Sequence, residues 1–150
     1  MANYALATYN VPEGRHGLTA VSTDAPLPIA GTVDATIFAS AARTAAVDSA
    51  DQTNYNGKGL HLVIDATVAP ATPSVTFTIQ GKDVVSGKYY TILASAAVTG
   101  VSTTVLKVYP GLTAAGNLVA SDVLPRTWRV SVTVADADSL TYSVGASIIP

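Results

Sequence analysis

The chain of 150 residues contains no cysteine. It therefore has no disulfide framework, no thiolate metal site and no cysteine nucleophile, a composition typical of proteins assembled in a reducing cytosol. At this length we expect a single domain, which buries roughly 70% of the surface that the unfolded chain exposes. Such a domain needs no covalent cross-links to be stable.

Charged residues are also scarce. Eight Lys and Arg and ten Asp and Glu make up 12% of the chain, where a soluble domain has about 25%. The net charge of −2 offers no basic footprint, so we expect no nucleic-acid partner. With 49% hydrophobic residues, the chain has too little charge to cover a free monomer in the usual way. We therefore expect part of the surface to be buried against other chains.

Long apolar segments are missing as well. The longest uncharged run, residues 89–106, is interrupted by threonine, serine and glycine and alternates as strands do. It is not expected to cross a bilayer. Residues 1–11 lack the basic and apolar regions of a secretion signal. The sequence thus predicts neither a membrane location nor ordinary secretion.

Residues suited to catalysis or metal binding are few. Glu13 is the one glutamate, and the two histidines, His16 and His61, have no second ligand at metal-binding spacing. Asp136 and Asp138 fit a hairpin turn better than a calcium loop, because the further oxygen ligands are missing. The sequence has neither a serine elbow nor a glycine-rich phosphate loop. We therefore predict no enzyme activity, no catalytic residue, no cofactor and no metal site.

What the sequence does contain is a repeated alternation of apolar and polar residues. In residues 60–68, Leu60, Leu62 and Ile64 alternate with polar or smaller neighbours, and this period of two is the signature of a half-buried strand. The same pattern, with turn residues between the segments, predicts strands at 35–39, 44–48, 60–68, 75–79, 89–93, 103–109, 128–134 and 140–148.

Residues 33–51 are the most ambiguous part of the pattern. Their alanines favour helix, whereas Val33, Ile37 and Phe38 favour strand. Two short strands, at 35–39 and 44–48, are the preferred interpretation, and a short helix is the alternative.

The connections carry clear turn signals. Asn56-Gly57 is expected to form a tight turn through a positive φ. The longest connection, residues 112–125, is expected to turn at Gly116-Asn117 and to form a helical turn at 119–123.

These features predict an all-β fold, a single antiparallel β-sandwich or small barrel of about seven or eight strands. Residues 33–150 are expected to form the sandwich. Residues 1–32 contain prolines and glycines and show no sustained period, so they are expected to form an extended N-terminal arm. The arm has too many apolar residues for a disordered tail, and we expect it to dock on its own domain or on a neighbour.

Aromatic residues suggest one alternative function, a sugar-stacking platform like that of a carbohydrate-binding module. The candidates are Tyr55, Tyr89, Tyr90, Tyr109, Trp128 and Tyr142. Trp128 and Tyr142 lie at the inward parity of their strands, which favours a place in the core. Tyr89 and Tyr90 point to opposite faces of a strand, so at most one of them is available to a ligand.

Five stretches between residues 54 and 148 carry a resemblance to known proteins. They are Asn54-Tyr55-Asn56-Gly57-Lys58-Gly59-Leu60, Gly81-Lys82-Asp83 with Ser86-Gly87-Lys88-Tyr89-Tyr90, Tyr109-Pro110-Gly111, Leu124-Pro125-Arg126-Thr127-Trp128-Arg129-Val130 and Tyr142-Ser143-Val144-Gly145. In these turn and core residues, over about two thirds of the chain, the sequence resembles a group of small structural proteins of tailed bacteriophages. The resemblance implies a virion component assembled in the host cytoplasm.

Of the virion roles open to a small sandwich with an arm, capsid decoration (cement) on the outside of the head is the preferred hypothesis. It implies a homo-oligomer, with a trimer favoured, that binds the major capsid protein. The expected contact residues lie on the arm and on the longest connection: Tyr4, Leu6, Tyr9, Val11, Leu112, Leu118 and Val119. A tail or baseplate protein is the alternative within virions, and a carbohydrate-binding module is the alternative outside them.

Overall fold

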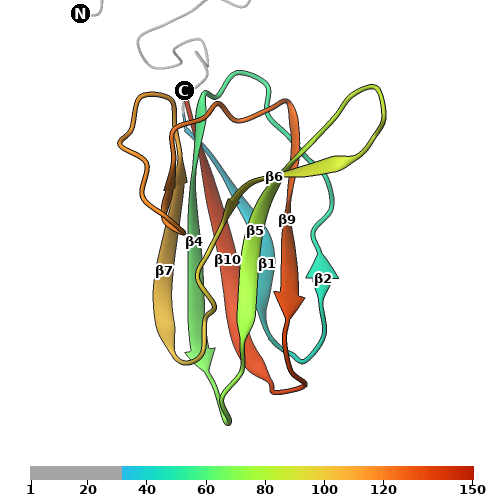
Figure 1. Cartoon of the computed structure of the whole chain (residues 1–150), viewed down its shortest axis with the longest axis vertical. Coiled ribbons are helices and arrows are strands. Elements are labelled where there is room, and N and C mark those ends of the chain that lie inside the picture. Colours follow the sequence, from blue (N-terminus) through green and yellow to red (C-terminus); the bar gives the residue numbers. More distant parts are fainter. Residues whose placement is uncertain (1–31) are drawn as a thin grey trace, which may run out of the picture.

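The computed structural model describes residues 32–150, and these residues form strands, turns and loops (Figure 1). Seven strands have six residues or more: β1 (Val33–Arg43), β4 (Gly59–Val68), β5 (Val75–Lys82), β6 (Tyr89–Ala94), β7 (Ser102–Val108), β9 (Thr127–Val134) and β10 (Leu140–Ile149). Three more have two residues each: β2 (Val47–Asp48), β3 (Gln52–Thr53) and β8 (Val119–Ala120).

The strands form two sheets packed face to face. One sheet has the order β1-β10-β4-β7-β8, and the other has the order β2-β9-β5-β6, with β3 also paired to β9. The predicted all-β sandwich is therefore confirmed. The barrel alternative is wrong, because the strands form two separate sheets.

The core lies between the two inner faces and follows the alternation seen in the sequence. Along β10 buried and half-buried residues alternate from Leu140 to Ile149, and β5 does the same. Phe77 meets Tyr142 of the opposite sheet edge to face, with ring centroids 4.9 Å apart. Burying a side chain of this kind contributes roughly 1.5–3 kcal/mol. Trp128 and Tyr142 are both at most 1% exposed, so the prediction that they belong to the core is confirmed.

The first strand differs from its prediction. In place of two short strands at 35–39 and 44–48, β1 runs unbroken over eleven residues, and just two residues of the second segment are paired, as β2. The register of β1 against β10 shifts between Thr36 and Phe38 and again between Phe38 and Ala41. These shifts are β-bulges, which let the alanine-rich β1 stay paired with β10 along its length. The helix alternative is wrong, since residues 33–43 are strand.

Arg43 ends β1 by occupying backbone carbonyls. Its guanidinium donates hydrogen bonds to the carbonyl oxygens of Ala39 (2.9 Å) and Ala41 (3.1 Å). It also donates to the Tyr142 carbonyl oxygen at 3.1 Å and lies 4.5 Å from the centre of the Tyr142 ring. The cation is thereby satisfied by dipoles and a π face at the margin of the core.

Three further predictions need correction. Residues 119–123 do not form a helical turn, because Val119 and Ala120 pair with β7 as strand β8. This pairing is parallel, so the sandwich is not antiparallel throughout. The alternation of residues 60–68 puts Val68 on the same face as Leu60, Leu62 and Ile64, yet Val68 is 52% exposed. The register of β4 against β10 shifts between Ala66 and Val68, opposite Tyr142 and Thr141.

We predict that the change Tyr142→Phe leaves the protein as stable or more stable. The Tyr142 hydroxyl is buried without a hydrogen-bond partner in the described structure, and burial raises the pKa of the phenol. An unpaired buried hydroxyl costs about 1–3 kcal/mol, so its removal relieves a penalty while the ring contacts remain. Thermal unfolding of both proteins tests this. A clear fall in the melting temperature would show that the hydroxyl has a partner.

Candidate functional site

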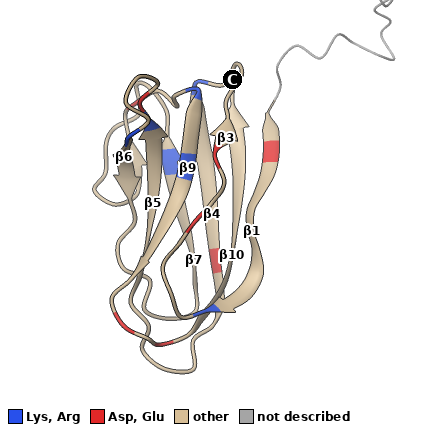
Figure 2. Ribbon diagram, turned by 90° about the vertical axis from the view of Figure 1, so that its right-hand side faces the viewer, with Lys and Arg blue, Asp and Glu red and all other residues tan. Residues whose placement is uncertain are grey.

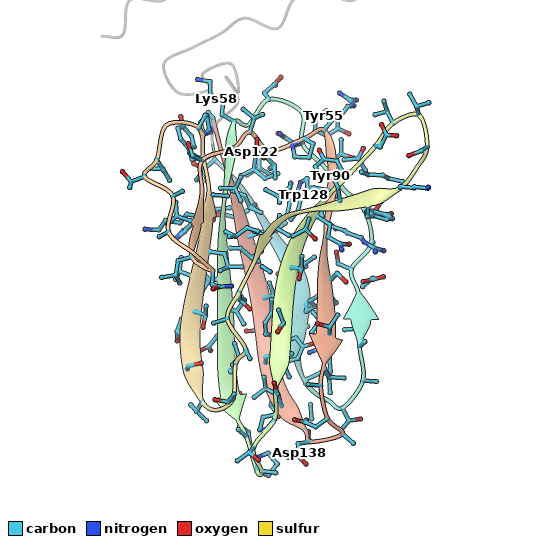
Figure 3. The ribbon with its side chains drawn as sticks, in the orientation of Figure 1. Tyr55, Lys58, Tyr90, Asp122, Trp128 and Asp138 are labelled. Carbon is cyan, nitrogen blue, oxygen red and sulfur yellow. The ribbon has the colours of Figure 1, made fainter. Side chains whose placement is uncertain are left out.

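Four loops lie at the end of the sandwich that carries the C-terminus and the start of β1, and we call it the upper end (Figure 1). The loops are residues 54–58 between β3 and β4, residues 83–88 between β5 and β6, residues 109–118 between β7 and β8, and residues 121–126 between β8 and β9. Figure 3 places Tyr55 and Tyr90 there. Large apolar side chains exposed at this end include Val33, Tyr55, Val84, Val85, Tyr90, Leu112 and Val123.

A buried asparagine joins two of these loops. The Asn54 side chain is 6% exposed, and its amide donates hydrogen bonds to the carbonyl oxygens of Gly57 (2.8 Å) and Leu124 (2.9 Å). Its amide oxygen accepts a hydrogen bond from the Gly57 N–H at 2.7 Å. A backbone hydrogen bond from the Leu124 N–H to the Lys58 carbonyl completes the join. The two loops therefore hold each other in place.

Gly57 is needed here for close packing. A Cβ atom at this position would collide with the side chain of Ile148. Positive φ angles among the described glycines occur at Gly87 and Gly111. The turn predicted at Asn56-Gly57 is thus in the right place, but its reason was wrong: the close approach of β10, not the backbone angle, requires glycine.

The β5–β6 loop projects from the upper end (Figure 1) and is held by hydrogen bonds among its own polar groups. The Asp83 carboxylate accepts hydrogen bonds from the Ser86 hydroxyl (2.5 Å) and the Ser86 N–H (2.9 Å), which hold the pKa of Asp83 below its usual 3.8. Gly87 has a φ of 71°, a conformation that favours glycine. Val84 and Val85 stand at the tip with 85% and 91% of their surface exposed.

Two tyrosines complete the apolar surface of the upper end. The ring of Tyr90 lies across Gly81, where the missing Cβ leaves room for it, and the side chain stays 48% exposed. Tyr55 is 74% exposed, and the Arg126 guanidinium lies 5.4 Å from the centre of its ring. The upper end therefore presents exposed apolar side chains on loops that hydrogen bonds hold in place.

The contact residues predicted from the sequence fall into two groups. Tyr4, Leu6, Tyr9 and Val11 lie outside the described residues. Leu112 and Leu118 belong to the loop between β7 and β8 and are 39% and 49% exposed, while Val119 begins β8 and is half-buried. The exposure of Leu112 and Leu118 leaves them available for contact.

The β7–β8 loop also forms one wall of a hollow of about 500 Å³. Asn117 holds the loop in place, since its side-chain amide donates a hydrogen bond to the Ala94 carbonyl at 3.2 Å. Asn117 has a φ of 64°, so the turn predicted at Gly116-Asn117 is confirmed. Residues 96–102 and Thr104 line the hollow together with residues 116–118.

Val84 and Val85 were not among the contact residues predicted from the sequence. A signal was present in the sequence: two adjacent valines stand in a loop bracketed by Gly81 and Gly87, where polar residues are the norm. Val123 lies in the longest connection, which was expected to carry contacts.

An ion-pair cluster on the outer face of the β2-β9-β5-β6 sheet fastens the β2–β3 segment. The Asp51 carboxylate accepts hydrogen bonds from Lys82 (2.7 Å) and from the Tyr89 hydroxyl (2.6 Å), and these bonds lower the pKa of Asp51 below 3.8. Arg129 lies 3.6 Å from the centre of the Tyr89 ring and forms an ion pair with Asp48 at 2.8 Å. Tyr89 is thus engaged within the cluster.

Two kinds of feature are absent from residues 32–150. No group of three His, Asp or Glu side chains is placed to hold a metal ion. No helix in this part of the chain is long and apolar enough to cross a membrane.

No protein-family model matches the chain, and no curated protein matches it. Among solved structures, the chain is similar to one described as the structure of infectious bursal disease virus, Gx strain, with a TM-score of 0.42 and 11% sequence identity. The alignment covers 78% of this chain and 31% of that chain, so this chain spans about a third of the other's length. A likeness of this degree assigns neither a fold family nor a function.

We predict that Asn54→Ala destabilises the protein by about 1–3 kcal/mol, because it leaves buried polar groups of two loops unpaired. Hydrogen exchange should accelerate at the Gly57 amide, which loses its acceptor. Thermal unfolding and exchange rates measure both effects. Asn56→Ala, at an exposed asparagine two positions along, is the control and should leave both unchanged.

A second prediction concerns the loss of the Asp51 contribution to stability at low pH. Because the folded-state pKa of Asp51 lies below its ordinary 3.8, the carboxylate contributes stability above 3.8 and loses it as the pH falls through the lowered pKa. The melting temperature of Asp51→Asn should therefore lie below that of the native protein at pH 7, and the difference should shrink in strong acid. Asp122→Asn, which touches neither ion pair, serves as the control. A difference independent of pH would contradict the assignment.

Proposed function

We propose that this protein is a structural protein of a tailed-bacteriophage virion and that it binds the outside of the head as a decoration (cement) protein. One observation carries the proposal: exposed valine and tyrosine side chains gather at the upper end, on loops fixed by hydrogen bonds. Exposed apolar patches on a soluble protein typically mark a contact surface. Loops that are already ordered lose little conformational entropy when a partner covers them.

The distribution of charge supports a partner-covered surface. Figure 2 shows that charged residues are sparse along the strands. The chain has 18 charged residues in 150, and Asp48, Asp51, Lys82 and Arg129 are already committed to ion pairs. A weakly charged surface is typical of the large interfaces of permanent assemblies, whereas a free monomer usually has a more charged surface.

The phage resemblance supports the same surface. Two of the stretches that carry it, residues 54–60 and 124–130, contain the residues that Asn54 joins at the upper end. These stretches are the frame of the exposed surface, so the resemblance and the proposed contact surface concern the same part of the molecule.

The proposed role is one of binding, without a reaction. The partners would be the major capsid protein and other copies of this chain, with a homotrimer favoured, and the location would be the capsid surface after assembly in the host cytoplasm. Tyr4, Leu6, Tyr9 and Val11 of the arm, with Leu112, Leu118 and Val119, remain predicted contact residues. Deleting residues 1–30 and measuring capsid occupancy tests the arm's share.

Particle fractionation tests the role itself. The protein should co-sediment with virus particles purified from a lysate of the producing culture, and immunogold labelling should mark their heads. Label on tails would favour the tail or baseplate role. A protein that stays in the soluble fraction would overturn a virion role of either kind.

We predict that the double change Val84→Ser and Val85→Ser weakens binding to purified heads at least tenfold. Each change removes roughly 1 kcal/mol of apolar burial from the contact, while the exposed loop tip keeps its fold. Co-sedimentation titration measures the affinity. Val68→Ser alters an exposed valine at the opposite end of the sandwich and is the matched control. Equal binding by all three proteins would remove the upper end from the contact.

A further inference from the structure

Strand β7 is half-covered on one side. β4 pairs with it along its whole length, from Ser102 to Val108. On the other side, β8 pairs with Lys107 and Val108 alone. Within the described residues, the stretch 102–106 therefore has an open edge.

The groups that face this edge follow from the alternation of hydrogen bonds along a strand. The Lys107 N–H donates to the Leu118 carbonyl, and the Tyr109 N–H donates to the Ala120 carbonyl, so odd-numbered residues of β7 point their backbone groups away from β4. By the same alternation, the N–H and C=O groups of Thr103 and Val105 point at the open edge. Such a row of unpaired groups is a template for one more strand.

The hollow beside the β7–β8 loop lies along this edge. Leu106 and Val108, on the inward parity of β7, are fully buried, whereas Thr104 on the same parity is half-exposed and lines the hollow. Its other walls come from residues 96–102 and 116–118, and no charged side chain lines it. A strand added to β7 would therefore place alternate side chains in an uncharged recess.

We propose that a segment within residues 3–11 of the same chain forms this added strand. Residues 1–12 contain no charged side chain, and the stretch offers Tyr4, Leu6, Tyr9 and Val11 before Pro12, which lacks an N–H and so favours an end to strand pairing. An uncharged segment thus meets an uncharged recess. Figure 1 shows that the chain enters β1 at the upper end, where β7 ends.

The tether is long enough and favours the same chain. The 20 residues from 12 to 31 span up to about 66 Å when extended, about twice the length of a ten-residue strand of roughly 33 Å. A segment on a tether of this length has an effective concentration in the millimolar range. At micromolar protein it therefore reaches its own β7 before that of a second copy.

The docked strand would gather the predicted contact residues. Leu118 lines the hollow, so Tyr4 and Leu6 would lie close to it although more than a hundred positions separate them in sequence. The docking is a property of the free chain, and it holds or fails separately from the virion role.

Amide hydrogen exchange of the full-length protein tests the added strand. The Thr103 and Val105 amides should exchange at least tenfold more slowly than in the variant Leu6→Asp, which places a charge in the recess. Val21→Asp, the same kind of change within the tether, is the control and should keep the protection. Rapid exchange at both amides in the native protein would overturn the proposal, and so would protection that Leu6→Asp leaves intact.

Disulfide trapping identifies whose segment docks, and the chain has no native cysteine to interfere. Thr103→Cys is combined in turn with Ala5→Cys, Ala7→Cys or Tyr9→Cys, and the oxidised proteins are run on a non-reducing gel. At least one pair should form a cross-linked monomer with altered mobility. A ladder of dimers and trimers would overturn docking within one chain, and no disulfide in any pair would overturn docking altogether.

Discussion

The packing of the two inner sheet faces against each other is the interaction on which the rest of the structure depends. Phe77 of one sheet and Tyr142 of the other meet edge to face at 4.9 Å, and Trp128 is fully buried beside the same layer of apolar side chains. Because side chains alternate with a period of two, a slip of one residue in any long strand would turn its apolar set toward water. The core thus fixes the register, and the register fixes where each loop leaves the sheets.

The upper end shows how such a sandwich can keep apolar side chains in water. Asn54 and Asp83 satisfy backbone groups of the upper-end loops through side-chain hydrogen bonds, and Leu124 anchors its loop in the core. Val84, Val85 and Tyr55 are left over as exposed surface. The hydrogen-bonded polar groups lie within the loops, and the apolar side chains of Val84, Val85 and Tyr55 face solvent. Hydrogen bonds thus hold the loops in place, and the exposed apolar side chains stay available for contact.

The two edges of the β1-β10-β4-β7-β8 sheet differ in how open they are to another strand. Arg43 occupies carbonyl groups near the end of β1, and the bulges of that strand disturb its outer row. Such features discourage pairing with another chain. β7 has no comparable guard from Ser102 to Leu106, and a recess of small side chains lies beside it. Within the described residues, this asymmetry leaves β7 as the edge of this sheet that is open to a further strand.

The sequence by itself determined the class of fold, the strands with clean alternation and the burial of Trp128 and Tyr142, because a period of two records which side of a strand meets the core. It did not determine the length of β1 or the strand character of Val119, since both depend on partners distant in sequence that override local propensity. Only the tertiary structure brought Asn54 to Leu124 and placed the β5–β6 loop at the same end of the sandwich as these two loops. Contacts between loops depend on the positions of whole strands, and no local pattern of residues encodes those positions.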